Sequence, residues 1–291
     1  MFLTQSWTEY EVLDTGGGEK LERWGKIVVR RPDPQTIWPP ADASLWKQAR
    51  AHYHRSDKGG GSWEFLSELP ERWVIHHDDL SFYIRPTGFK HMGLFPEQAS
   101  NWDWMRRVIR EDGRENLRVL NLFGYTGGAT LACMAAGTHV THVDAAKGMV
   151  LWAKDNRALS NLPETGCRWI VEDVMRFIQR EIRRGSRYDG LVMDPPSYGR
   201  GPSGEVWKLE NELYPLISTA AQLLSEEPAF FLVNSYTTGF QASVLSNLLE
   251  KCVVSRHGGT VDSEELCLPV KTGGVLPCGA SGRWARAGHP V

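Results

Sequence analysis

The sequence predicts an α/β protein in which a doubly wound, largely parallel sheet follows a small β-rich domain. From residue 101 onward, apolar strand-like runs alternate with helix-like segments, which is typical of a parallel sheet covered by helices. Before residue 100, short β-like runs are separated by Gly and Pro clusters. We therefore predict two domains, residues 1–100 and residues 101–291.

The N-terminal region has strand-like runs at residues 26–30, 73–77 and 81–85. It also holds half of the tryptophans of the chain: Trp7, Trp24, Trp38, Trp46, Trp63 and Trp73. Aromatic rings can stack on nucleic-acid bases. In a small domain they more often fill a core that is short of aliphatic side chains, and we favour that interpretation.

The segment from Arg118 to Asp144 is the most informative part of the chain. An apolar strand over residues 119–123 leads into a turn with Gly124, Gly127 and Gly128, then a helix over 129–136 and a second strand that ends at Asp144. Asp144 follows Gly124 by about 20 residues, the spacing at which a carboxylate at a strand end binds a ribose. The alternative is that Asp144 caps the next helix.

The order of the glycines indicates which nucleoside ligand to expect. It is G-x-x-G-G and not G-x-G-x-x-G, so the spacing that cradles a pyrophosphate is absent. We therefore predict a nucleoside ligand without a pyrophosphate, with S-adenosylmethionine as the leading candidate.

The remaining elements continue the alternation. We predict helices at residues 101–110, 147–160, 174–184, 211–224 and 241–251, and strands at 168–171, 188–193, 229–234, 265–270 and 282–287. Ligands of such sheets bind at the carboxyl ends of the strands. Asp173 and Asp194 fall at two of these ends. Asp173 either accepts a hydrogen bond from an adenine amino group or caps the helix that follows it.

The second motif is Asp194-Pro195-Pro196-Ser197-Tyr198. Two prolines after a strand-end acid fix the backbone, because each pyrrolidine ring locks φ. Carbonyl groups and the Asp194 carboxylate then face the place where a methyl acceptor would lie, and Tyr198 offers a ring for stacking on a base. A Pro-Pro turn without a function is the alternative.

Composition excludes several classes of protein. The net charge of −2 gives no global attraction to nucleic acid, so any RNA contact must be a local patch. We find no apolar run long enough to span a membrane and no secretory signal at the N-terminus. The five cysteines are scattered without metal-ligand spacing, so we expect a reduced, cytoplasmic protein with no disulfide and no metal site.

Five segments together resemble the S-adenosylmethionine-dependent methyltransferases related to the bacterial large-subunit (23S) rRNA methyltransferases. They are LNLFGYTGG, VDAAKGMVLWAKDN, EDVMRFI, DPPSYGR and the preceding TGFKHMGLFPEQ, and the resemblance covers roughly residues 84–287. It implies a Rossmann-like class I methyltransferase sheet with a small β-rich domain before it. It also implies rRNA methylation with S-adenosylmethionine as the cofactor.

The resemblance also implies roles for residues. Asp144 would take the ribose, Asp173 the adenine, and Asp194 would face the sulfonium and the acceptor. The full set implied to bind the cofactor is Phe95, Gln98, Asn121, Phe123, Gly124, Tyr125, Thr126, Gly127, Asp144, Ala145, Asp173, Val174 and Asp194. The set implied for catalysis is Asp194, Pro195, Pro196 and Tyr198. Ala99 replaces an arginine of the family pattern, which puts a contact to an anionic ligand in doubt.

Some relatives make 5-methylcytosine, which requires a cysteine nucleophile. The two positions where such a thiol would lie hold Ser197 and Ser235, and a hydroxyl is a much poorer nucleophile. Cys278 could approach the site, but we favour a structural role for it. We therefore predict direct methyl transfer without a covalent enzyme intermediate.

The acceptor remains open among three hypotheses. An arginine-dense stretch from Arg106 to Arg118, with a second on a later helix from Arg176 to Arg187, favours RNA, although a charged solvated face explains it as well. Near-neutral charge favours a small molecule or a protein side chain instead. The third hypothesis is a non-catalytic protein that binds the cofactor. The sequence leaves the oligomeric state open.

Overall fold

The computed structural model describes residues 1–5, 7–56, 60–200 and 206–289. The chain divides into two compact units. Unit 1 comprises Met1–Phe2, Ser100–Leu266 and Gly279–Val291, and unit 2 comprises Leu3–Ala99 and Cys267–Cys278. The predicted boundary near residue 100 assigns residues 267–278 to the second domain. In the structure these residues form the tip of the last β-hairpin and belong to unit 2.

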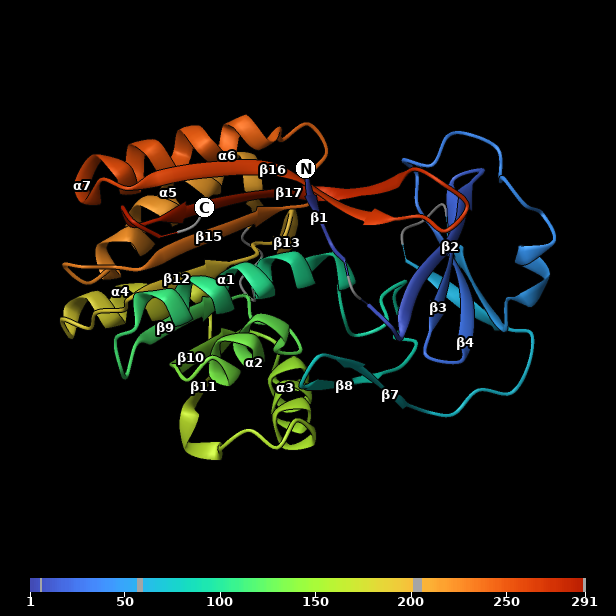
Figure 1. Cartoon of the computed structure of the whole chain (residues 1–291), viewed down its shortest axis with the longest axis horizontal. Coiled ribbons are helices and arrows are strands. Elements are labelled where there is room, and N and C mark those ends of the chain that lie inside the picture. The colour runs from blue at the N-terminus through green and yellow to red at the C-terminus, as the bar shows by residue number, and fades with distance from the viewer. Residues whose placement is uncertain (6, 57–59, 201–205, 290–291) are drawn as a thin grey trace. The chain divides into compact units, whose positions relative to one another are not determined.

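Unit 1 is built on an eight-stranded sheet with the order β1-β16-β17-β15-β12-β9-β10-β11 (Figure 1). The strands are β1 Phe2–Leu3, β9 Arg118–Leu122, β10 His139–Asp144, β11 Cys167–Val171, β12 Gly190–Met193, β15 Phe230–Ser235, β16 Thr260–Pro269 and β17 Val275–Ala285. The five central strands β11, β10, β9, β12 and β15 pair in parallel, and β17 joins β15 antiparallel. The chain order therefore reverses between β9 and β12, where ligands of open α/β sheets bind.

Helices cover both faces of this sheet, as the doubly wound prediction requires (Figure 1). They are α1 Ala99–Asp112, α2 Gly128–Ala135, α3 Lys147–Leu159, α4 Val174–Arg183, α5 Leu209–Ala220, α6 Ala242–Leu249 and α7 Ser255–His257. Alternate strand residues such as Leu120 and Leu191 pack with α4, α5 and α6 in one core. On the opposite face, the Trp104 ring of α1 meets Phe230 edge-on. The α/β, Rossmann-like fold class is thus confirmed.

Most predicted elements appear within a few residues of their predicted bounds, and the differences have local causes. The predicted helix over 211–224 begins at Leu209 and ends at Ala220, followed by a 3-10 turn, Ala221–Leu223. The two closing strands are longer than predicted because they form one antiparallel hairpin. The short strands β13, Tyr198–Arg200, and β14, Val206–Lys208, pair with each other and were not predicted.

Unit 2 contains a five-stranded sheet, β2-β3-β4-β5-β6, and a separate hairpin, β7-β8. The strands are β2 Tyr10–Gly16, β3 Glu19–Trp24, β4 Ile27–Pro32, β5 Ala51–Arg55, β6 Gly61–Phe65, β7 Trp73–His77 and β8 Leu80–Ile84. The strands that the sequence did not reveal, such as β3 and β5, carry many charged and histidine residues. Their apolar alternation is therefore weak.

The tryptophans of unit 2 support the packing interpretation over base stacking. Trp24 is fully buried. The indole N–H groups of the other five tryptophans each donate a hydrogen bond inside the unit. Trp7, Trp63 and Trp73 donate to the carbonyl oxygens of Pro96, Thr87 and Trp24, respectively. Trp38 and Trp46 donate to side-chain oxygens of Thr15 and Asp14, respectively.

Candidate cofactor and acceptor site

The turn from Phe123 to Gly128, here called the glycine turn, follows β9 and begins α2. The Gly124 N–H donates to the Val143 carbonyl at 3.0 Å, and the Asn156 side chain donates to the Thr126 carbonyl at 2.9 Å. Phe123 and Tyr125 have φ of 58° and 49°, in the left-handed region that non-glycine residues rarely adopt. Such backbone costs free energy and persists only where surrounding contacts impose it, which is common at functional sites.

Gly124 is required by its neighbour His142. A Cβ at position 124 would lie 2.4 Å from Cε1 of the His142 ring, closer than packed atoms approach. His142 is fully buried, and burial lowers its pKa to about 3, so the ring is neutral. One hydrogen of Gly124 thus faces this ring, which fixes the turn from inside the protein.

Asn121 belongs to the same buried network. Its side-chain amide donates to the Thr130 hydroxyl at 2.8 Å, and that hydroxyl contacts Nδ1 of His142 at 2.8 Å. Asn121 is 3% exposed. These contacts give Asn121 a supporting position beneath the glycine turn, whereas its predicted direct contact with the cofactor stays a prediction.

Asp144 holds the glycine turn at the end of β10. Its Oδ2 accepts from the Tyr125 N–H at 2.9 Å, and its Oδ1 accepts from the Ala146 N–H at 2.8 Å. Burial raises the pKa of this carboxyl group, although the two amide hydrogen bonds oppose the rise. A carboxylate has about four acceptor sites, so two donors leave capacity for the hydroxyls of a ribose. The residues therefore fit a nucleoside at this strand end.

Asp173 shows the alternative role that the sequence left open for it. Its Oδ1 accepts from the Arg176 N–H at 2.9 Å and caps α4. The side chain is exposed, while Val174 beside it is buried. Ala145, after Asp144, is exposed. A contact of Asp173 with adenine stays a prediction, as do those of Ala145 and Val174 with the cofactor.

Residues 194–198, here called the proline turn, follow β12. They lie at the carboxyl ends of the parallel strands, as the glycine turn does. Trp207 Nε1 donates to the Pro196 carbonyl at 2.7 Å, and the Leu209 N–H donates to the Ser197 carbonyl at 3.1 Å. The Thr237 hydroxyl donates to Ser197 Oγ at 2.7 Å. The turn is thus fixed by β14, by the start of α5 and by the segment that follows β15.

The side chains of the proline turn are mostly accessible. Asp194 is half-buried and Pro195 is buried, whereas Pro196, Ser197 and Tyr198 are exposed. Tyr198 begins β13 and exposes 51% of its surface. An exposed planar ring in the turn that follows a strand-end acid can receive a planar acceptor.

Trp207 connects the two turns, and sequence reasoning missed it. Its ring lies 6.2 Å from that of Phe123, centroid to centroid, while its indole N–H holds Pro196. A contact between Phe123 and Trp207 is not visible in a linear sequence. An isolated aromatic residue shortly after the proline motif was the only signal that could have indicated it.

Phe95 and Gln98 belong to unit 2, within the segment before α1. Phe95 precedes the 3-10 turn Pro96–Gln98, and the Glu97 carbonyl accepts from the Thr4 hydroxyl at 2.8 Å. Their predicted contacts with the cofactor stay predictions.

The serines and cysteines agree with a mechanism that uses no thiol. Ser235 is buried at the end of β15, and all five cysteines are free thiols. Cys278 belongs to unit 2, and burial there raises its thiol pKa well above the ordinary value. A thiol held protonated is a poor nucleophile.

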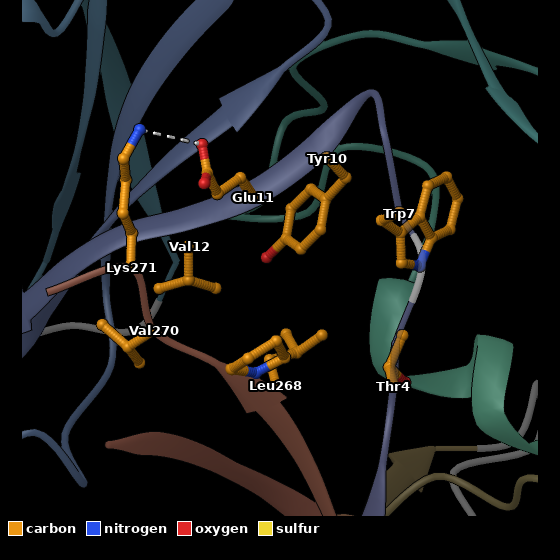
Figure 2. Close-up of a pocket in the computed structure, with 9 residues that line it drawn as sticks. Thr4, Trp7, Tyr10, Glu11, Val12, Leu268, Val270 and Lys271 are labelled. Carbon is orange, nitrogen blue, oxygen red and sulfur yellow. Dashed lines mark ion pairs between the residues drawn. The ribbon is translucent and has the colours of Figure 1, made fainter. Parts of the chain in front are cut away.

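Unit 2 also contains a cavity of about 190 Å³ that the sequence did not indicate (Figure 2). Figure 2 shows Trp7 and Tyr10 on one side and an ion pair between Glu11 and Lys271, 3.6 Å apart, on the other. The Tyr10 hydroxyl donates to Glu22 Oε1 at 2.6 Å, so its polar end has a protein partner. All residues lining this cavity belong to unit 2.

Comparisons with known proteins point to one kind of enzyme. Residues 22–213 match the model of a family described as S-adenosylmethionine-dependent methyltransferase. The crystal structure of an S-adenosylmethionine-dependent methyltransferase from Agrobacterium tumefaciens is similar with a TM-score of 0.91 and 38% identity, over 97% of this chain and 92% of that one.

Curated relatives are more distant and longer. Ribosomal RNA large subunit methyltransferase K of Neisseria meningitidis is 25% identical over 75% of this chain and 59% of its own length. The K/L enzyme of Syntrophotalea carbinolica is 27% identical over 62% of this chain and 25% of its own length. The chain thus spans less than two thirds of these relatives.

Proposed function

The chain belongs to the S-adenosylmethionine-dependent methyltransferase family, and from this premise we propose that it methylates a base of ribosomal RNA. The observation that carries the proposal is the meeting of the glycine turn and the proline turn through Phe123 and Trp207. This contact joins the turn suited to the cofactor to the strand pair β13–β14, which carries the exposed Tyr198 ring suited to a planar acceptor.

S-adenosylmethionine is the cofactor, and it supplies an electrophilic methyl group on a sulfonium. We propose that Asp144 holds its ribose hydroxyls and that the backbone of residues 123–127 surrounds its methionine part. The two left-handed residues, Phe123 and Tyr125, turn successive peptide groups away from regular structure. The Tyr125 N–H already donates to Asp144, so this backbone links the strand end to the carboxylate that would hold the ribose.

The proline turn would position the acceptor. Asp194 sits at the end of β12, where its carboxylate can orient the acceptor and take up a proton as the nucleophile attacks. Pro195 and Pro196 stiffen the backbone, and Trp207 keeps the Pro196 carbonyl fixed. Alignment of two reactants accounts for a large part of the rate enhancement in such a displacement. No cysteine takes part.

The RNA acceptor rests on the names of the relatives and on the exposed ring of Tyr198. The arginine-dense stretches give mixed support. Arg180 pairs with Glu172, and Arg168 and Arg184 both pair with Glu181. These pairs favour a charged solvated face for α4, so we assign RNA contact to the acceptor site itself.

A small-molecule or protein acceptor is the second candidate, favoured by the net charge of −2. Among the described residues no helix is long and apolar enough to cross a membrane. A cytoplasmic location stays a prediction from the cysteine pattern.

The test uses ribosomal RNA from cells that lack the protein. Purified enzyme and labelled S-adenosylmethionine should transfer label to this RNA and much less to RNA from cells that contain the protein, since its sites are already methylated. Label in the protein or small-molecule fraction, with none in RNA, would contradict the RNA proposal. Transfer to none of these would indicate a non-catalytic cofactor-binding protein.

A further inference from the structure

We propose that unit 2 binds a divalent transition-metal cation, Zn²⁺ in the first instance, at His52, His54 and Glu64. Each of the three offers one ligand atom, and these atoms lie within 4.8 Å of one another. Two imidazoles and a carboxylate form a ligand set typical of zinc sites.

The pairing of β5 with β6 creates this cluster. His52 and His54 are two residues apart on β5, so their side chains share one face of the sheet. Glu64 on β6 lies directly opposite His52 in the antiparallel register. The two imidazole centroids are 3.9 Å apart, and His54 Nε2 lies 2.7 Å from Glu64 Oε2.

Glu19 provides a second carboxylate next to the cluster. Its Oε1 lies 2.6 Å from His52 Nε2, and its other oxygen contacts Arg30, which orients it. Both histidines therefore direct a ring nitrogen toward a carboxylate. In the absence of a metal, each such contact needs a proton on the nitrogen. A cation placed among these atoms would replace the protons and bind nitrogen and oxygen together.

The ligand types select the metal class. Imidazole suits zinc, copper and nickel, whereas a site for Ca²⁺ or Mg²⁺ would consist of oxygen ligands alone. His54 and Glu64 expose about half of their side-chain surface, so the cation has direct access from solvent. Because β6 is an edge strand of the five-stranded sheet, the bound cation would tie this edge to β5 and stabilise unit 2.

The test is a Zn²⁺ titration of the whole, chelator-treated protein, followed by metal analysis after dialysis. The wild type should retain one equivalent of Zn²⁺ and show a higher Tm with the metal. His54→Gln should weaken binding by at least about tenfold, because even the loss of an outer-shell partner costs 10–100-fold. The double variant His52→Gln/His54→Gln should retain none.

His76→Gln is the matched control. His76 is also exposed and also contacts a carboxylate in unit 2, with Nδ1 2.9 Å from Glu9 Oε2, but among the described residues it belongs to no group of three metal-binding side chains. This variant should bind Zn²⁺ like the wild type, because His76 is not part of the cluster of His52, His54 and Glu64. The proposal is overturned if the double variant retains as much Zn²⁺ as the wild type. It is equally overturned if X-ray absorption of the zinc complex shows sulfur ligands, since the cysteines would then be the site.

Discussion

The glycine turn and the proline turn both lie at the carboxyl ends of the central parallel strands, but different kinds of contact hold them in place. The glycine turn is held on its inner side by the buried His142 and Asn156 and by the half-buried Asp144. The proline turn is held from the side, by Trp207 and Thr237 in segments with substantial exposure. The glycine turn is therefore part of the core, whereas the proline turn is held at the surface.

Because of this difference, we expect cofactor binding and methyl transfer to respond to different substitutions. A change in the glycine turn should disturb the core and the cofactor together, because the same contacts serve both. A change in the proline turn should alter methyl transfer and leave stability nearly intact.

Gly124→Ala should destabilise the protein by about 3 kcal/mol, at the upper end of the usual cost of overpacking a core. The new methyl group would lie 2.4 Å from the His142 ring, which is buried and cannot move freely. Denaturant unfolding measures the effect, and affinity for S-adenosylmethionine should fall with it.

Gly148→Ala is the control for the Gly124 variant. Gly148 lies in α3, and a Cβ there would meet nothing within 4 Å. Alanine at this position should be neutral or stabilising by about 0.5 kcal/mol, because it reduces the entropy of the unfolded chain. Equal destabilisation by both variants would refute the role of His142.

Asp144→Ala should weaken cofactor binding by about 1.5–3 kcal/mol, the cost of losing hydrogen bonds to a charged group. Calorimetric titration checks this value. Asp173→Ala is the comparison, since it removes a helix cap worth about 1 kcal/mol of stability. If Asp173 contacts only α4, cofactor affinity should survive its loss. Unchanged affinity in the Asp144 variant would remove this residue from the site.

Tyr198→Ala should weaken acceptor binding by about 1–3 kcal/mol, the range for loss of a stacked base. Tyr198→Phe should cost much less because the ring is retained. KM for the RNA acceptor measures both effects. The unfolding free energy should stay close to that of the wild type because the side chain is 51% exposed. Equal losses in the two variants would indicate that the hydroxyl, and not the ring, is what matters.

The pH dependence of cofactor binding should be smaller but specific. Burial raises the pKa of Asp144, and ribose hydroxyls would donate to its ionised form. Binding thus selects the deprotonated carboxyl group, so affinity should fall as pH is lowered through this pKa. Asp144→Asn should flatten the profile, whereas an unchanged profile would assign the titration to another group.

The sequence predicted the strand, glycine turn and acidic strand end well because these features are local. Apolar runs define β9 and β10, and glycines are expected where the backbone must turn sharply. The same locality explains the prediction of the proline motif at the end of β12. The contacts that determine what these motifs do could not be predicted in this way.

Long-range contacts account for what was missed. In the sequence His142 is an ordinary strand residue. Its ring contacts Gly124 only because β9 and β10 pair. The Asn101 side-chain amide donates a hydrogen bond to Asn234 Oδ1, 133 positions along the chain. The Ser281 hydroxyl donates to the same oxygen, so the three residues form a buried network. The cluster of His52 and Glu64 depends likewise on strand register.

The most direct test of the account is to measure methyl transfer, cofactor affinity and Tm on one sample of Asp194→Ala. Asp194 directly follows β12 and precedes the stiffened prolines, and a positioned acid or base contributes about 10²–10⁴-fold to rate. We predict turnover reduced by at least about 100-fold, with Tm close to that of the wild type. Near-normal turnover per folded molecule together with a lowered Tm would make Asp194 a structural anchor and would contradict the assignment of the proline turn to the acceptor site.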